Sequence, residues 1–368
     1  MRKIDSLYLH FPFCAHLCNY CDFYKKIPEN KAQDYENFHR YLQGAFDEHE
    51  KLRKVNGYSW APLKTLYIGG GTPSLWGIEG ARFLKNFLKD NALSLAPDCE
   101  FTLEVNPGAW DEYTLSEWEK IGVNRYSLGI QSLDGTLSKY LDRVHSIEDV
   151  YATLEFFYRK KVNFSVDFML GLPFSKELSR DVINELERAL KFNPSHFSVY
   201  ILTVKNNYTH YKQLPAEEWI EKEYLSVAHF LKEKGFRHYE VSNFALPNKE
   251  SRHNLNYWKS KTVAGLGPSA TGFFAEEKLR YKWKTNSPVM ELENLLDTEF
   301  HLEKVYMALR SFIGIDLDSF LPEKNVFKKW EKMGWAAIEQ DRYLTLTSHG
   351  YLILDTLINE LFTLKLIK

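Results

Sequence analysis

The sequence predicts an α/β fold with parallel strands, followed by a smaller α+β C-terminal part. Short runs rich in β-branched and aromatic residues alternate with helically periodic segments through about two thirds of the chain. Alternation of this kind favours right-handed crossovers in an open sheet or a barrel, complete or partial. Glycine, cysteine and polar residues follow several of the runs, at the edge where barrel enzymes place their sites. After about residue 290 the alternation stops.

The elements can be placed in order along the chain. Strands are expected at 6–11, 64–70, 100–106, 124–130, 163–171, 196–202 and 237–244. Helices are expected between them at 33–55, 78–92, 146–160, 178–192 and 215–234. With 368 residues the chain exceeds one ordinary core, so we expect a large domain and smaller ones.

The C-terminal part has a different pattern. Residues 301–314 and 324–333 have helical spacing, 335–347 reads as a hairpin, and Leu354, Leu357, Ile358 and Leu361 form a helical stripe. Helices around a two-stranded wing predict a winged-helix-like module over 301–368, after a barrel at 1–234 and an extension at 235–300. That module has nine Lys plus Arg and nine Asp plus Glu, so it has no basic excess for DNA.

Composition limits the function classes. The chain has 47 Lys plus Arg against 49 Asp plus Glu, which disfavours a nucleic-acid partner. It shows neither a signal-peptide pattern nor a run of about 18 apolar residues, so we expect a cytoplasmic protein. Cysteines stay reduced there, which makes a disulfide framework improbable and a metal site the better interpretation.

Three of the four cysteines lie within eight residues. Cys14, Cys18 and Cys21 have the spacing C-x3-C-x2-C, and Cys99 is remote in sequence. Soft thiolates select zinc or iron–sulfur chemistry. A zinc loop would need a fourth ligand, for which His10 and His16 are candidates. A four-iron cluster held by three thiolates would instead leave one iron open to a small molecule.

Chemically distinctive residues follow the predicted strands. Glycines that end the second strand let backbone groups approach a ligand, and a hydroxyl, two carboxylates, an amide and a guanidinium follow nearby. Taken singly, each is more often a turn, a solvated charge or a structural pair than a ligand. The set comprises Gly70, Gly71, Thr72, Glu104, Gln131, Arg143 and Asp167.

The cysteine motif together with "YIGGGTPS" resembles the radical S-adenosylmethionine (radical SAM) family. The resemblance implies a partial (β/α)6 barrel with a 4Fe-4S cluster on Cys14, Cys18 and Cys21, whose open iron binds SAM and cleaves it to a radical. The stretches "EVNP", "SLGIQS", "LDRVH" and "VDFMLGLP" match SAM-contacting stretches of the coproporphyrinogen dehydrogenase branch. SAM contacts are thus implied for the seven residues above, and Tyr8 matches a tyrosine beside the cluster.

The resemblance covers nearly the whole chain, through "GFRHYEVSNFA", "RHNLNYW" and "GLGPSA". This branch contains coproporphyrinogen III dehydrogenases and HemW-type haem chaperones. At one position the dehydrogenases have a fourth cysteine. This chain has Phe23 there, and the chaperones also have phenylalanine. The chaperones' H-N-x-x-Y-W motif implies haem binding by His253, Asn254, Tyr257 and Trp258. From the residues alone, a histidine beside aromatic residues, such as His253, is more often a packed core histidine than a haem ligand.

We therefore expect a haem chaperone that binds a 4Fe-4S cluster, SAM and haem. It would deliver haem to acceptor haemoproteins at the inner face of the membrane; whether it forms a homodimer stays open. The alternatives are a radical-generating coproporphyrinogen III dehydrogenase, which Phe23 disfavours, and a zinc-stabilised interaction protein. Two positions depart from the family pattern, Lys205 where Glu is frequent and Thr271 where His is frequent.

Overall fold

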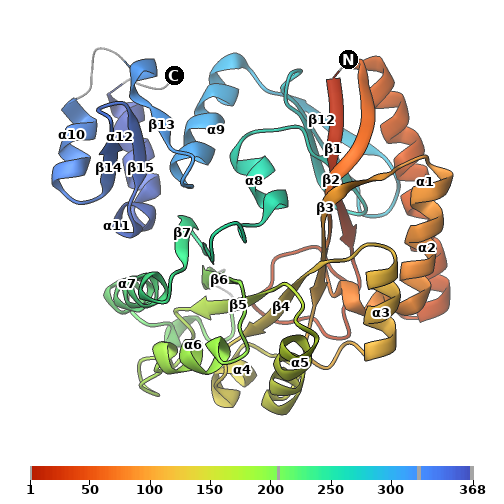
Figure 1. Ribbon diagram of the computed structural model, residues 1–368, viewed down its shortest axis with the longest axis horizontal. Helices are drawn as coiled ribbons and strands as arrows, with labels where there is room; N and C mark the ends of the chain where they lie inside the picture. The colour runs from red at the N-terminus through yellow and green to blue at the C-terminus, as the bar shows by residue number, and fades with distance from the viewer. Residues whose placement is uncertain (1, 205–207, 321–324, 365–368) are drawn as a thin grey trace.

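A single curved sheet forms the centre of the molecule (Figure 1). The computed structural model describes residues 2–204, 208–320 and 325–364. Nine strands pair in the order β7-β8-β6-β5-β4-β3-β2-β1-β9, and β1 to β6 and β9 run parallel to one another. Their bounds are β1 Arg2–Phe11, β2 Tyr58–Gly70, β3 Leu95–Val105, β4 Arg125–Gln131, β5 Phe164–Leu170, β6 His196–Ile201, β7 Arg237–Glu240, β8 Asn243–Ala245 and β9 Ala264–Leu266. This confirms the predicted partial barrel.

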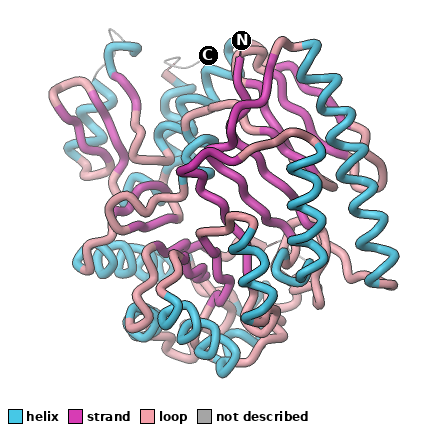
Figure 2. The backbone as a smooth tube through the Cα atoms, turned by 45° about the vertical axis from the view of Figure 1, so that its right-hand side comes forward, coloured by secondary structure: helices cyan, strands magenta, loops and turns pink. Residues whose placement is uncertain are grey.

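Helices cover the outer side of the curved sheet, and the concave side stays largely free of them (Figures 1 and 2). The covering helices are α1 Lys31–Val55, α2 Gly77–Asp90, α3 Glu112–Lys120, α4 Gly135–Tyr140, α5 Ile147–Lys160, α6 Val182–Leu190 and α7 Glu217–Glu233. One short helix, α8 (Arg252–Trp258), lies within the curve instead. Among the described residues, no helix is both long and apolar enough to cross a membrane.

Alternation along the strands separates an apolar outer layer from a polar lumen. On β2 and β3, Leu66, Ile68 and Leu103 are fully buried in the core beneath the outer helices. Alternate residues face the other way. On β4 these are Arg125, Ser127, Gly129 and Gln131, all of which line a cavity. Closed (β/α)8 barrels fill this space with branched apolar side chains, whereas polar side chains such as Arg125, Ser127 and Gln131 line this lumen.

Two elements differ from the prediction. The run 237–244 is not one strand but a hairpin, because β7 and β8 pair antiparallel and β8 also pairs antiparallel with β6. The helix expected at 178–192 begins at Val182, since the Asp181 side chain caps it by accepting the Asn184 N–H. The amphipathic helix α3 and the short α4 were missed.

The C-terminal third forms two small sheets. Strands β10 (Thr271–Phe274), β11 (Leu279–Trp283) and β12 (Met290–Asn294) make an antiparallel sheet that was not predicted. The second sheet joins β13 (Ile315–Asp316) to the predicted hairpin of β14 (Ala336–Glu339) and β15 (Tyr343–Leu346). Helices α9 (Asp297–Leu309), α10 (Asn325–Lys332), α11 (Ser348–Leu352) and α12 (Leu354–Thr363) surround it. The predicted stripe on α12 is buried.

The helix expected at 301–314 is shifted towards the N-terminus. It spans Asp297–Leu309 because Glu299 accepts the Leu296 N–H at its start. At its other end Ser311 leaves the helix to bridge Glu240 of β7.

Candidate functional site

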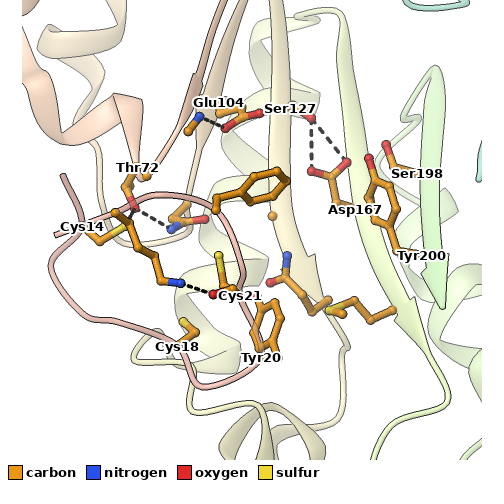
Figure 3. Close-up of a pocket in the computed structure, with 18 of the residues that line it drawn as sticks. Cys14, Cys18, Tyr20, Cys21, Thr72, Glu104, Ser127, Asp167, Ser198 and Tyr200 are labelled. Atoms are coloured by element: carbon orange, nitrogen blue, oxygen red, sulfur yellow. Dashed lines mark hydrogen bonds between the residues drawn. The ribbon is translucent and has the colours of Figure 1, made fainter. Parts of the chain in front are cut away.

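One cavity of about 430 Å³ lies between the cysteine-bearing loop and the barrel lumen (Figure 3). This volume falls within the roughly 300–1,000 Å³ of ligand pockets. The cysteines and most of the polar residues singled out from the sequence line it together. Those residues are Cys14, Cys18, Cys21, Gly70, Gly71, Thr72, Glu104, Gln131, Arg143, Asp167 and Asn254.

The loop after β1 is fixed by its own backbone. Phe13 and Lys26 form a bridge, the Cys14 N–H donates to the Lys26 carbonyl at 3.0 Å, and the Lys26 N–H donates to Pro12 at 2.8 Å. Residues 14–25 are therefore held as a closed loop over the strand ends. The Lys25 ammonium also donates to the Cys21 carbonyl.

The glycines after β2 support this loop. A Cβ on Gly71 would lie 2.4 Å from the Phe13 carbonyl oxygen, and one on Gly70 would lie 2.7 Å from the Phe11 carbonyl oxygen. Instead, the Gly71 N–H donates to Phe11 at 2.7 Å and the Thr72 N–H donates to Phe13 at 2.8 Å. In the structure these glycines admit the backbone that carries the cysteines, and both also line the cavity, so their predicted contact with a ligand stays a prediction.

Two of the three thiols have polar side chains nearby. The Thr72 hydroxyl lies 3.6 Å from Cys14 Sγ, and Arg143 Nη1 lies 3.9 Å from Cys18 Sγ. Burial raises the pKa of Cys14 and Cys18, and the Arg143 charge partly offsets this for Cys18. Within the described ranges, no group of three or more His, Cys, Asp or Glu side chains is arranged to hold a single metal ion.

Two carboxylates face the cavity from the lumen. Glu104 accepts from the Tyr67 hydroxyl at 2.8 Å and the Gly70 N–H at 3.0 Å. Asp167 accepts from the Ser127 hydroxyl at 3.1 Å, and it lies in the middle of β5 rather than at its predicted end. Burial raises the pKa of Glu104 to about 7 and that of Asp167 to about 6.

Arg143 and Gln131 offer unsatisfied polar atoms. Arg143 Nη2 donates to the Gly129 carbonyl at 2.8 Å and to Asn106 Oδ1 at 3.0 Å, but its buried Nε has no partner. Gln131 has a φ of 62°, and its buried Oε1 also has no partner. Buried polar atoms are normally paired, so both atoms suit a ligand that enters the cavity.

Tyr8 and Thr271 lie beside a second pocket of about 350 Å³. The Tyr8 hydroxyl is 3.0 Å from His10 Nδ1, and His10 Nε2 is 2.8 Å from the Tyr24 carbonyl. Tyr8 does not line the cysteine cavity, although its ring lies 6.0 Å from the ring of Tyr67, which does. Phe23, 71% exposed, lines both pockets. Lys205 lies outside the described residues.

Two of the four residues of the implied haem motif contact each other on α8, and the other two have different surroundings. His253 is 1% exposed, with Nδ1 3.0 Å from Thr65 Oγ1 and Nε2 3.3 Å from the Tyr257 hydroxyl. Asn254 lines the cysteine cavity, whereas Tyr257 lines the second pocket. The Arg310 guanidinium stacks 4.0 Å from the centre of the Trp258 ring. The structure does not bring these side chains together around one space.

Several cavity residues were missed from the sequence. Tyr20 follows Cys18 on the loop, and the others lie on strands. Arg125, Ser127 and Met169 are at two-residue steps from Gln131 or Asp167. Three more, His196, Ser198 and Tyr200, alternate along β6, from which no residue had been singled out. Strand alternation was the signal available, since residues two apart on a strand share a face.

Comparisons with known proteins identify the family. The profile of the Radical SAM superfamily matches residues 8–186. "Heme chaperone HemW" of Lactococcus lactis is 30% identical over 90% of this chain and 88% of its own length. The Bacillus subtilis protein of that name is 32% identical over 73% of this chain and 71% of its own. The structure of coproporphyrinogen III oxidase (HemN) from Escherichia coli superposes with a TM-score of 0.76, at 18% identity, over 97% of this chain and 90% of HemN. The chain therefore belongs to the radical SAM superfamily and, within it, to the HemW family.

Proposed function

We propose that this protein is a haem chaperone that carries a 4Fe-4S cluster and SAM. Radical SAM membership implies the cluster and SAM, and haem enters the proposal through the name of the HemW relatives. The proposal depends on one observation: three thiols of a C-x3-C-x2-C loop share a cavity with two carboxylates, an amide and a guanidinium.

The donor set of the loop fits a cluster with three protein ligands. Cys14, Cys18 and Cys21 would each hold one iron, and a bound cluster would supply one electron to SAM at the remaining iron. Thiolates are the binding form, and the cations of Arg143 and Lys25 close to the loop favour it. The hydroxyl of Thr72 orients towards Cys14.

The polar lining fits SAM, which carries an ammonium, a carboxylate and ribose hydroxyls. Arg143, with its unpaired Nε, would pair with the carboxylate. Glu104 and Asp167 would accept hydrogen bonds from hydroxyl or amino groups. Gln131 has a free carbonyl oxygen for a further donor.

Haem does not fit the described arrangement of α8. Both imidazole nitrogens of His253 have neighbours within 3.3 Å, and the Trp258 ring has Arg310 on one face. Haem ligation by His253 therefore requires α8 to move. Delivery to acceptor haemoproteins, at the cytoplasmic face of a membrane, is part of the proposal and follows from the family resemblance alone.

Haem titration tests the chaperone function. The wild-type protein should develop a Soret band that saturates with added haem, and His253→Ala should weaken or shift it. His229→Ala is the matched control, because this side chain is 76% exposed on α7. A wild-type protein without a Soret band would refute haem binding, and an unchanged band in His253→Ala would refute the ligand assignment.

An activity assay separates the main alternatives. A coproporphyrinogen III dehydrogenase would convert its substrate under reducing conditions with SAM, and a chaperone would not. Phe23, where the dehydrogenases have a fourth cysteine, is the residue that disfavours the dehydrogenase. A zinc-stabilised interaction protein would contain zinc and no iron.

A further inference from the structure

The floor of the cavity contains a buried cation that has no partner within the described part of the chain. Arg125, the first residue of β4, is 3% exposed and lines the cavity. Among the described residues its guanidinium makes no hydrogen bond or ion pair, although its nitrogens are not sealed away from the cavity. Arg180, which is also buried, instead contacts Glu185 at 2.6 Å and Glu223 at 3.5 Å. A buried charge without a counter-charge is costly.

The two nearby carboxylates do not serve as partners. Both oxygens of Glu104 accept from Tyr67 and Gly70, and Asp167 accepts from Ser127. Burial raises the pKa of both carboxyl groups, and the charge of Arg125 offsets only part of that rise. Arg125 therefore influences the pKa of these carboxyl groups without a hydrogen bond to either of them. Its hydrogen-bond donors remain available to a ligand.

The floor and the cysteine end of the cavity are at opposite ends of β4, because Arg125 is its first residue and Gln131 its last. Arg143 contacts Cys18 at the cysteine end. The lumen thus has a guanidinium near each end. A ligand carboxylate at the cysteine end would pair with Arg143, so Arg125 would remain available to another group.

We infer that the cavity floor binds the carboxylate of an organic ligand, with Arg125 as the anchor. The planar guanidinium pairs with carboxylate through two parallel hydrogen bonds. Carboxylate is favoured over phosphate because a second negative charge would lie close to Glu104 and Asp167. Asn254 of α8 and Ser198 of β6 line the same cavity and supply neutral polar groups. The inference is independent of haem binding and adds a ligand class to the cavity.

Calorimetry with 4-bromobenzoate as the probe and its neutral amide as the control tests this inference. The full-length protein should be saturated with SAM, at fixed ionic strength, so that the cysteine end is occupied. We expect the acid to bind about 10-fold or more tightly than the amide, as for one charge-assisted pair. Arg125→Gln should remove that difference, whereas Arg159→Gln, which changes an exposed arginine of α5, should retain it.

Four results would overturn the inference: no binding of the acid at 10 mM (about the weakest affinity of interest), equal binding of acid and amide, wild-type binding in Arg125→Gln, or an equal loss in Arg159→Gln. If Arg125→Gln does not fold by circular dichroism, Arg125→Lys decides. Lysine keeps the positive charge but lacks the two parallel N–H donors of the guanidinium, so we expect about 3- to 10-fold weaker binding of the acid. Wild-type affinity in Arg125→Lys would then overturn the inference.

Discussion

Replacing Gly71 by alanine should disturb the cysteine loop more than the fold. The new Cβ would lie 2.4 Å from the Phe13 carbonyl oxygen, where ordinary contact begins at 3.4 Å, so the two segments must separate by about 1 Å. That movement weakens the hydrogen bonds from Gly71 to Phe11 and from Thr72 to Phe13. At about 1 kcal/mol each, their loss costs about 2 kcal/mol. Cys14, the next residue after Phe13, moves with the loop.

The assay compares iron content after anaerobic reconstitution with the free energy of unfolding from urea titration. We expect cluster affinity to fall by about 10-fold or more, as for other residues that orient metal ligands. Gly135→Ala is the control, because its Cβ would meet only the Ile147 side chain at 3.3 Å at the start of α4. Wild-type iron loading in a folded Gly71→Ala protein would refute the proposed support of the loop.

Three further predictions concern the lumen, a buried ion pair and the cysteines. Burial raises the pKa of Glu104 from 4.5 to about 7, so the folded state binds an extra proton in that window and the free energy of unfolding falls as pH rises through it. Glu104→Gln should flatten this fall between pH 4.5 and 7 in urea titrations, and an unchanged slope would contradict the assignment. Glu185→Ala removes the 2.6 Å partner of Arg180, whose remaining carboxylate, Glu223, is 3.5 Å away, and should lower the free energy of unfolding by about 3–5 kcal/mol; a loss below 1 kcal/mol would contradict this. Cys18→Ser should lose iron, whereas Cys99→Ser, a buried free cysteine on β3, should retain it; equal loss in both would argue against the loop as the binding site.

The barrel and most of its site residues could be predicted because they depend on local patterns. Runs such as 64–70 and 100–106 combine β-propensity with a terminal turn, and the polar residues that follow parallel strands meet at one edge of the sheet. The structure brings Glu104, Gln131 and Arg143 around one cavity in this way. The fold was thus accessible from periodicity and turn chemistry.

Features that depend on tertiary packing could not be predicted. The reversal of chain direction at 241–242 is set by pairing of β8 with β6, which is remote in sequence. The burial of His253 results from α8 lying against Thr65 of β2 within the curve of the sheet. Arg125 begins a strand and resembles a surface charge, and only the assembled lumen reveals that it is enclosed and unpaired.

The content of iron and acid-labile sulfide after oxygen-free reconstitution tests the central claim most directly. The proposed cluster predicts about four irons and four sulfides per chain, bound through the three cysteines of the 14–21 loop. SAM should then perturb the electron paramagnetic resonance spectrum of the reduced cluster. A colourless protein with stoichiometric zinc and no sulfide would contradict the account.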